Sequence, residues 1–316
     1  MTSSSHFLFL FLDGVGVGDE NPNANPFFSS DLKNFKSIFG GVPSKAKPFI
    51  ENGTAFVQSC DALLGVEGFP QSGTGQVTLF TGVNAARIIG MHFGPYPHSE
   101  IRSILEGKNI FKVLKNVGAD VYFANAFPRQ FFEYVESGRR KLSATTLSCM
   151  MSGVPLCNAD SLRTGGGISA DITAERWHSD LGYSDITPMR AADAGQVLRR
   201  IAENHDFTMF EFFLTDKAGH DQDKPVAEKV LGMFDEFLGG ITEDGLEKLT
   251  ILISSDHGNV EDLSVKTHTL NASLTAVAGE HAEFFRGKFR SITDVTPAIV
   301  RLFERRIAQL PRLQAF

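Results

Sequence analysis

Residues 7–14 read FLFLFLDG, an alternation of phenylalanine and leucine that ends directly at an aspartate and a glycine. Two later apolar segments have the same form: Phe207–Leu214 shortly precedes Asp216, and Leu249–Ile253 shortly precedes Asp256. Strands that are apolar on both faces are typical of the middle of a parallel sheet covered by helices. We therefore predict three central strands, each of which ends close to an aspartate.

Helical patterns between these segments favour a doubly wound α/β fold. Residues 224–238 carry an early proline and apolar side chains at helical spacing, and they stop at a Gly-Gly pair. Residues 294–303 begin with Asp-Val-Thr-Pro, which suits an N-cap and an early proline. The alternation predicts a mostly parallel sheet with helices on both faces. We expect residues 1–127 and 191–316 to form this α/β core and residues 128–190 to form a small cap-like excursion.

The composition excludes several classes of protein. The 316 residues are 42% hydrophobic, which is enough for a large core, and no apolar run approaches the roughly 18 residues of a membrane span. The formal net charge of −7 gives no reason to expect a nucleic-acid partner. Cys60, Cys149 and Cys157 are too few for a disulfide framework. Residues 2–6 supply no basic region for a signal peptide, so we expect a cytoplasmic enzyme.

Six side chains near the predicted strand ends suit a metal centre. In α/β sheets the carboxyl ends of the strands meet at the edge where ligands bind, so the three aspartates are expected to converge. Like charges held close together are costly unless a cation neutralises them. Imidazole and carboxylate ligands together suit zinc or manganese, although each histidine alone is more often an ordinary residue. The set is Asp13, Asp216, His220, Asp256, His257 and His268.

A loop rich in glycine and hydroxyl groups supplies a candidate nucleophile. Residues 69–76 read FPQSGTGQ, and the glycines beside Ser72 let a phosphate approach the backbone closely. We expect a helix to open from about Val77, with its N-terminal amides favouring an anion. The Gly-x-Ser-x-Gly elbow of serine hydrolases is absent from the loop, which favours activation of Ser72 by a metal. Thr74 and Thr78 are the rival hydroxyls.

Five short motifs, taken in order, resemble those of the alkaline phosphatase superfamily. Each motif is weak alone, and their order makes the resemblance specific. The similarity is closest to the branch that contains cofactor-independent phosphoglycerate mutase and phosphopentomutase. The motifs are LDG at 12–14, the Ser72 loop that closes on Thr-Gly at 81–82, Asp-x-x-Gly-His at 216–220, SDHGNVE at 255–261 and Thr-His-Thr at 267–269.

The resemblance implies a metal-dependent phosphoryl-transfer enzyme with two divalent ions, manganese or zinc, and a small phosphorylated substrate. Ser72 would attack a phosphoryl group and become a phosphoserine, and water would then release phosphate. The resemblance assigns Asp216, His220 and His268 to one ion, and Asp13, Asp256, His257 and the Ser72 oxygen to the other.

Three functions are compatible with these residues. The mutases of this family carry a large separate domain that closes over the intermediate, whereas the segment between Ser72 and Asp216 is too short for one. Without exclusion of water we expect hydrolysis to win, so a phosphatase-type hydrolase is favoured. A phosphomutase is the first alternative, and a non-catalytic metal-binding protein on the same scaffold is the second.

Contacts to the substrate are predicted from charge and position. Arg87, Lys217 and Lys266 are cations that would meet a phosphate, although a solvated surface cation is the ordinary alternative for each. His92 and Tyr96 follow the nucleophile loop and are further candidates for the pocket. The sequence leaves open the leaving group, the preference for monoesters or diesters, and the oligomeric state.

Overall fold

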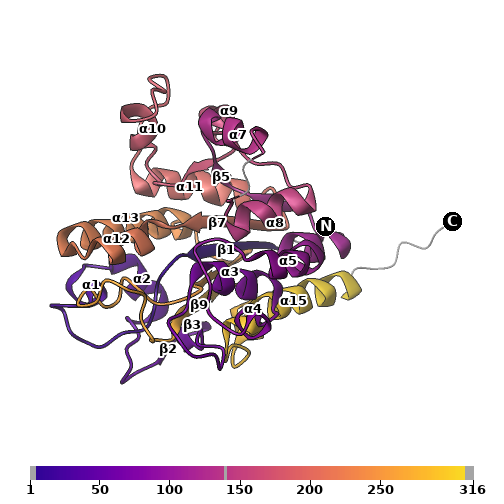
Figure 1. Ribbon diagram of the computed structural model, residues 1–316. Helices are drawn as coiled ribbons and strands as arrows, with labels where there is room; N and C mark the ends of the chain where they lie inside the picture. The colour runs from indigo at the N-terminus through magenta and orange to yellow at the C-terminus, as the bar shows by residue number, and fades with distance from the viewer. Residues whose placement is uncertain (1–4, 139–140, 310–316) are drawn as a thin grey trace.

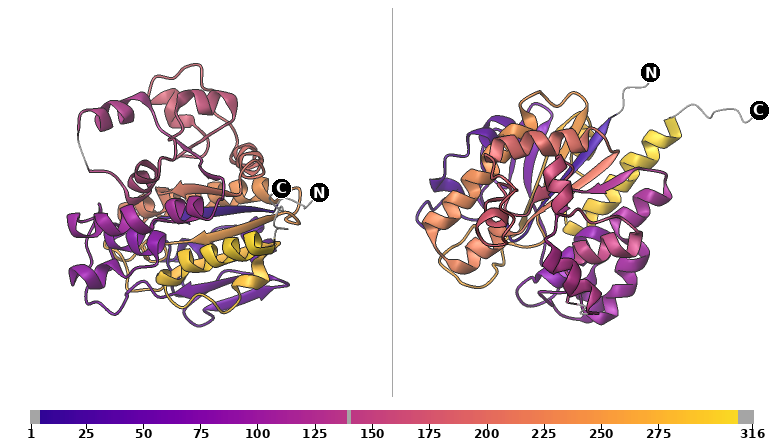
Figure 2. Two further views of the ribbon diagram at one scale, coloured as in Figure 1. Left: turned by 90° about the vertical axis from the view of Figure 1, so that its right-hand side faces the viewer. Right: turned by 90° about the horizontal axis from the view of Figure 1, so that it is seen from above.

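The computed structural model describes residues 5–138 and 141–309. Within these residues a seven-stranded sheet runs through the molecule in the order β2-β3-β9-β8-β1-β7-β4 (Figures 1 and 2). Its strands are β1 (His6–Leu12), β2 (Phe49–Asn52), β3 (Ala55–Cys60), β4 (Val121–Phe123), β7 (Phe207–Phe212), β8 (Leu249–Ser254) and β9 (Ser273–Gly279).

The predicted strands form the centre of this sheet. β1 pairs in parallel with both β7 and β8, so that Phe7 lies opposite Phe207 on one side and Thr250 on the other. β4 extends the parallel part beyond β7, whereas β9, β3 and β2 complete the other edge in antiparallel pairing. β7 and β8 are buried along their whole length. The predicted α/β fold with a mostly parallel sheet is confirmed.

The alternation in β1 divides the core between the two faces of the sheet. Leu8, Leu10 and Leu12 belong to one apolar cluster and Phe7, Phe9 and Phe11 to the other, because successive side chains of a strand point to opposite faces. The leucine face packs against α1 (Pro26–Ser29), α2 (Lys33–Phe39), α11 (Ala191–Ala202), α12 (Leu214–Asp221) and α13 (Lys224–Thr242).

Helices of the phenylalanine face come mainly from the first half of the chain and from its end. The ring of Phe80 lies edge-on to Phe11 with 5.2 Å between ring centroids, so the helix that begins at Ser72 packs directly against β1. None of the helices in the described part of the chain has the length and apolar character of a membrane span. The elements on this face are α3 (Ser72–Thr81), α4 (Ala85–Ile89), η1 (Ser99–Ile101), α5 (Arg102–Lys108), α6 (Ile110–Asn116), α8 (Ala144–Ser152), α14 (Ala282–Phe285), η2 (Ile292–Asp294) and α15 (Val295–Gln309).

A smaller unit, called the upper unit below, stands beyond the β7–β4 side of the sheet, at the top of Figure 1. Trp177, Ile186 and Cys157 form an apolar cluster within it. Its elements are β5 (Asn125–Ala126), α7 (Arg129–Glu136), α9 (Ala159–Thr164), β6 (Ile168–Ser169) and α10 (Glu175–Ser179). α8 comes from the same stretch of chain but lies against α3, α5 and α6 of the core. The boundaries 128–190 of the cap-like excursion therefore stay a prediction.

One predicted helix end is wrong. α13 was expected to stop at Gly239-Gly240 and instead continues to Thr242. A Cβ atom on Gly240 would lie 1.9 Å from the carbonyl oxygen of Ala192 in α11. The glycine is needed because the backbones of α11 and α13 touch there, and this packing outweighs the low helix propensity of glycine.

Candidate metal and active site

The six predicted ligands lie at the carboxyl ends of the three central strands. Asp13 directly follows β1, and Asp256 and His257 follow β8, as the apolar runs indicate. The chain after β7 differs from the expectation, since the strand ends at Phe212 and α12 begins at Leu214. Asp216 therefore lies in the first turn of a helix with His220 one turn later on the same face. His268 comes from the loop before β9.

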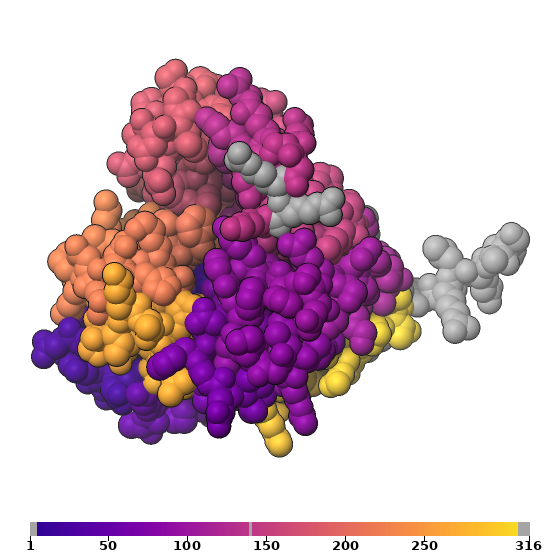
Figure 3. All heavy atoms as spheres, viewed as in Figure 1, coloured from indigo at the N-terminus to yellow at the C-terminus, as the bar shows by residue number. Residues whose placement is uncertain are grey.

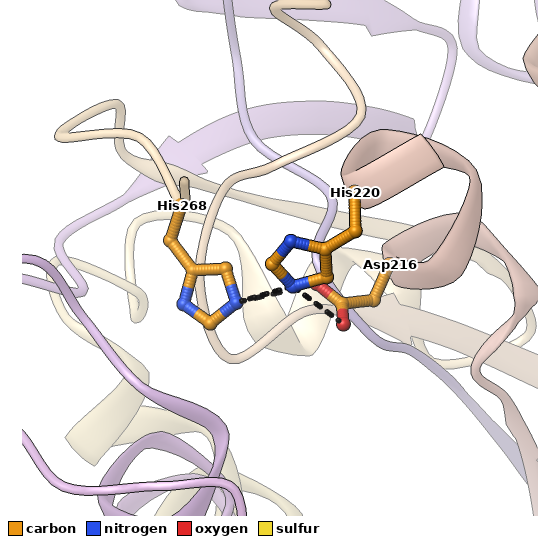
Figure 4. Close-up of side chains that lie close together, drawn as sticks. All are labelled: Asp216, His220 and His268. Carbon is orange, nitrogen blue, oxygen red and sulfur yellow. Dashed lines mark hydrogen bonds and ion pairs between the residues drawn. The ribbon is translucent and has the colours of Figure 1, made fainter. Parts of the chain in front are cut away.

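Asp216, His220 and His268 form the first cluster (Figure 4). The Nε2 atom of His220 lies 3.4 Å from Asp216 Oδ2, and the Nε2 atom of His268 lies 3.5 Å from Asp216 Oδ1. The Nδ1 atoms face backbone carbonyl oxygens, Lys266 O at 3.0 Å from His220 and Pro70 O at 2.6 Å from His268. A proton on each Nδ1 leaves a lone pair on each Nε2, which is the form that binds a metal.

Ser72, His257, Asp13 and Asp256 form the second cluster. His257 Nε2 lies 3.0 Å from Ser72 Oγ and 3.4 Å from both Asp13 Oδ1 and Asp256 Oδ2. These two carboxylate oxygens are buried and have no hydrogen-bond partner. Buried polar atoms are normally satisfied, so two orphan oxygens around one imidazole nitrogen fit a bound cation.

Asp216 also reaches the second cluster. One ligand atom from each of Asp13, Asp216 and His257 lies within 4.8 Å of the other two. A carboxylate has two oxygens and can serve two neighbouring ions at once. The geometry thus joins the two predicted metal positions through Asp216, which the family resemblance assigns to only one of them.

The pKa values reflect crowding of carboxylates in a buried site. Burial raises the pKa of Asp13 well above its ordinary value, and the neighbouring Asp256 and Asp216 raise it further. Burial and Asp216 raise the pKa of Asp256 to about 7. Burial also acts to raise the pKa of Asp216, but the hydrogen bond to His220 and the nearby His257 outweigh it and hold this pKa at about 2. Without cations the site resists carrying all of its negative charge.

The nucleophile helix begins earlier than expected. α3 starts at Ser72 itself rather than near Val77, with Gln71 in the N-cap position. Ser72 therefore lies in the first turn, where backbone amides favour an anion. A Cβ atom on Gly75 would lie 3.0 Å from the carbonyl oxygen of Asp256, so the glycine lets the loop after β8 reach the start of this helix.

The structure separates Ser72 from its two rivals. Thr74 Oγ1 donates a hydrogen bond to Gln71 O at 3.2 Å, and Thr78 Oγ1 donates to Thr74 O at 2.8 Å. Both hydroxyls are engaged within their own helix and its cap. The hydroxyl of Ser72 instead lies 3.0 Å from His257 Nε2, the atom that both orphan oxygens approach to 3.4 Å.

Comparisons with known proteins give a match to a family of metalloenzymes. A model of the Metalloenzyme superfamily matches residues 153–305, a segment that includes five of the six predicted aspartate and histidine ligands. The resemblance to this superfamily is confirmed. The family description names metalloenzymes, and the two clusters provide the carboxylate and imidazole groups that divalent metals use.

Proteins with similar sequences include phosphoglycerate mutases. The 2,3-bisphosphoglycerate-independent phosphoglycerate mutase of Desulforudis audaxviator is 29% identical over 126 residues, which make up 37% of this chain and 25% of that protein. The corresponding enzyme of Sulfurimonas denitrificans is 27% identical over 128 residues, 38% of this chain and 26% of that protein. The match thus spans about a quarter of the length of these relatives.

Solved structures share the fold over almost the whole chain. The PH0037 protein from Pyrococcus horikoshii has a TM-score of 0.56 at 15% identity, covering 96% of this chain and 98% of that one. The alkaline phosphatase of the Antarctic bacterium TAB5 has a TM-score of 0.56 at 11% identity, covering 96% and 99%. At these identities the likeness concerns the fold alone, which is alkaline phosphatase-like.

Side chains not predicted for the site hold its ligands in place. Gln76 Nε2 donates to Asp13 Oδ2 at 3.2 Å, and Asn259 Nδ2 donates to Asp216 Oδ1 at 2.6 Å. Glu261 is buried and accepts hydrogen bonds from the loops after β1 and β8 and from the loop before β9. Glu261 and Asn259 belong to the SDHGNVE motif, and Gln76 belongs to the Ser72 loop. The two motifs therefore contain these supporting side chains, although the sequence predicts only the aspartate, histidine and serine ligands within them.

Glu211 is a further buried carboxylate beside the site. It lies in β7 and is 9% exposed, and burial raises its pKa to about 7 with Asp256 contributing. Among the described residues no lysine, arginine or histidine forms an ion pair with it. A single charged residue within the apolar run FTMFEFFL was the available signal.

A cavity of about 890 Å³ adjoins both clusters and reaches beneath the upper unit. The surface in Figure 3 is hollowed between that unit and the rest of the molecule. Lys217 and Tyr96 contribute to its lining, and Lys217 also pairs with Asp221. Of the other predicted contacts, Arg87 and Lys266 are exposed side chains that do not belong to the described lining. His92 likewise lies outside the lining and faces Val66 O at 3.3 Å.

Proposed function

We propose that this chain is a two-metal, phosphatase-type hydrolase that releases phosphate from small phosphorylated substrates through a phosphoserine at Ser72. The observation that carries the proposal is the 3.0 Å contact between Ser72 Oγ and His257 Nε2, flanked by the orphan oxygens of Asp13 and Asp256. A serine hydroxyl is a weak nucleophile and needs a base or a metal. Ser72 lies where a metal would provide that activation.

Two divalent ions, manganese or zinc, fit the donor groups of this site. When bound they supply charge neutralisation for the phosphoryl group and a lowered pKa for the serine hydroxyl. One would lie among Asp216, His220 and His268. The other would lie among Asp13, Asp256, His257 and the Ser72 oxygen.

Both halves of the proposed reaction centre on Ser72. Ser72 Oγ forms a bond to phosphorus while the bond from phosphorus to the ester oxygen breaks, and the alcohol leaves with the proton that the hydroxyl gives up. The first turn of α3 favours the phosphate charge beside Ser72. Water then adds to phosphorus, the bond to Ser72 breaks, and inorganic phosphate leaves with the hydroxyl restored.

A phosphomutase is the second candidate, and the similarity to phosphoglycerate mutases over 126 residues favours it. A mutase has to keep water from the phosphoserine while the product reorients, and the upper unit of this chain is small for that task. Release of inorganic phosphate, compared with formation of isomers across a panel of phosphosugars, separates the two activities. Isomer formation without phosphate release would overturn the hydrolase.

The nucleophile is tested by trapping the intermediate. The manganese- or zinc-loaded protein is mixed with a ³²P-labelled phosphate ester and quenched in acid, and we expect label on wild type and on Thr74→Ala but none on Ser72→Ala. Label on Ser72→Ala equal to that on wild type would overturn the assignment. Absence of both label and turnover with every ester tested would favour the non-catalytic metal-binding alternative.

A further inference from the structure

We propose that the alcohol part of the substrate is apolar, so that the cavity binds a phosphate monoester of an uncharged aromatic or long-chain aliphatic alcohol. This inference rests on the proposed function for the reaction itself. The apolar binding site is argued independently, from the lining of the cavity.

The lining of the cavity combines residues of the two clusters with a group of large apolar side chains. Ser72, Asp13, Asp216 and His220 are the residues of the clusters. Most of these large apolar side chains come from residues 127–181, and Tyr96 comes from the chain after α4. The residues of this apolar wall are Phe127, Phe131, Tyr134, Trp177, Leu181 and Tyr96.

Part of this apolar lining is exposed to solvent. Tyr96 is 39% exposed, and Phe213, which lines the cavity after β7, is 40% exposed. Large apolar surface that stays in contact with water at a binding site is covered favourably by an apolar ligand. The wall therefore favours a substrate whose carbon skeleton replaces that water.

The size of the cavity supports the same conclusion. Pockets of about 300–1,000 Å³ are those that bury most of a drug-sized ligand. The cavity of about 890 Å³ lies at the upper end of this range, so a three-carbon phosphate seated at the clusters would leave most of the apolar wall in contact with water. A ligand that extends from the clusters to the wall uses the whole site.

The charged side chains of the described lining that lie outside the metal clusters include three cations and the carboxylates of Asp171 and Glu211. The cations are Lys141, Arg176 and Lys217 among the residues the structure places, and two of these already form ion pairs. Lys217 and Arg176 each pair with an aspartate four residues further along the chain. Glu211 adds a buried carboxylate to the lining. A substrate carboxylate would be repelled by Glu211 in its ionised form, whereas an uncharged alcohol avoids this cost.

Binding of two phosphonates tests the proposal without depending on turnover. The metal-loaded protein is titrated by calorimetry with 4-phenylbutylphosphonate and with butylphosphonate, which share the anionic group and differ in the phenyl ring. Burial of the ring predicts an affinity at least about tenfold higher for the phenyl compound. Equal affinities, or tighter binding of 3-phosphoglycerate than of the phenyl compound, would overturn the proposal.

The single tryptophan of the chain reports where the ligand lies. Trp177 belongs to the apolar wall, so its fluorescence is expected to change when the phenyl compound binds. A saturable heat of binding with no change in the fluorescence of Trp177 would place the ligand elsewhere and contradict the proposal.

Two neighbouring phenylalanines on α7 form a matched pair of variants. Phe131 and Phe132 are both half-buried, but only Phe131 belongs to the described lining of the cavity. We expect Phe131→Ala to weaken binding of the phenyl compound about tenfold and to leave butylphosphonate unchanged, while Phe132→Ala changes neither. Equal losses in the two variants would overturn the proposal. If Phe131→Ala does not fold, Tyr96→Ala tests the apolar wall in the same way.

Hydrolysis of two esters separates this inference from the proposed function. 3-Phenylpropyl phosphate and propyl phosphate have leaving alcohols of similar acidity and differ in the apolar group. If the protein binds the phenyl phosphonate more tightly than butylphosphonate but releases phosphate from neither ester, the hydrolase is overturned and the apolar site is retained. Phosphate release with equal kcat/KM for the two esters would retain the hydrolase and overturn the apolar substrate.

Discussion

The Nε2 atoms of His220 and His268 face each other across 3.1 Å, although the two residues lie 48 positions apart in the chain. Each ring directs its Nδ1 atom at a backbone carbonyl oxygen, so both Nε2 atoms present lone pairs to the same point. Two lone pairs at this distance repel each other unless a proton or a cation lies between them. Asp216 adds a carboxylate beside this point, which favours a divalent cation.

Removing one of these imidazoles should empty one metal position. We expect His268→Ala to retain about one ion fewer per chain than wild type, because the first cluster then keeps only two donor side chains. Metal content is measured by elemental analysis after dialysis against manganese or zinc. His178→Ala is the control, since His178 lies on α10 and faces Ile186 O at 3.2 Å. Unchanged metal content in His268→Ala would contradict the assignment.

Glu211 should make the metal-free protein less stable as pH rises. Burial raises the pKa of this carboxyl from 4.5 to about 7, so between these pH values the folded state holds a proton that the unfolded state has lost. The free energy of unfolding therefore falls as pH rises from about 4.5 to 7 and stays low above pH 7. A rise in the pKa from 4.5 to about 7 corresponds to a loss of about 3 kcal/mol in the free energy of unfolding.

The variant Glu211→Gln stays neutral and should lose the part of this dependence that Glu211 contributes, while the parts from Asp13 and Asp256 stay. We expect the difference in the free energy of unfolding between Glu211→Gln and wild type to be about 2–3 kcal/mol more favourable to the variant at pH 8 than at pH 4.5. Urea unfolding in the presence of EDTA measures the difference at both pH values. Glu106→Gln, at an exposed position of α5, should show no such gain. A difference between Glu211→Gln and wild type that is the same at both pH values would contradict the prediction.

The close approach of Asp256 to α3 makes Gly75 sensitive to substitution. A Cβ atom there would lie 3.0 Å from Asp256 O and 3.1 Å from its Cβ, so Gly75→Ala should displace this ligand. We expect weaker metal binding by calorimetry and a loss of about 1–3 kcal/mol in the free energy of unfolding. Gly107→Ala is the matched control in α5, where nothing lies within 4 Å of the added atom. It should be neutral or stabilising by up to about 1 kcal/mol; equal effects of the two substitutions would refute the proposed clash.

Glu261 should act as a structural tie between the loops of the site. Its Oε2 atom accepts hydrogen bonds from Gly16 N at 2.9 Å and Asn259 N at 2.7 Å, and Oε1 accepts from the hydroxyl of Thr269. Glu261→Gln places an amide donor against at least one of these donors, so we expect a loss of about 2–4 kcal/mol in the free energy of unfolding. Urea unfolding measures it, with the exposed Glu280→Gln as control. Equal stability of the two variants would show that these hydrogen bonds contribute little.

The central strands could be predicted because their signal is local. Phe and Leu alternate in β1, which places each residue type on one face, and both faces are buried by helices. The convergence of the three strand-end aspartates followed from the general geometry of parallel sheets, and the structure brings Asp13, Asp216 and Asp256 around the same site.

Predictions at the ends of helices were less accurate, because these ends depend on packing between distant segments. Gly240 reads as a helix stop in the sequence, yet the contact with Ala192 keeps it inside α13. The start of α3 at Ser72 lies five residues before the apolar residue from which a helix was expected. Glu211 stands out as the one charged residue of an apolar run, but the run does not indicate that this side chain borders the cavity.

The sequence by itself determined the types of side chain available and the strands that carry them, because hydrophobic periodicity and ordered motifs are properties of neighbouring residues. Only the tertiary structure decided that Asp216 reaches both clusters, that the hydroxyl of Ser72 rather than that of Thr74 faces His257, and that aromatic side chains cover the cavity. These relationships are set by distances between residues far apart in the chain, and those distances are fixed only when the sheet and its covering helices pack together.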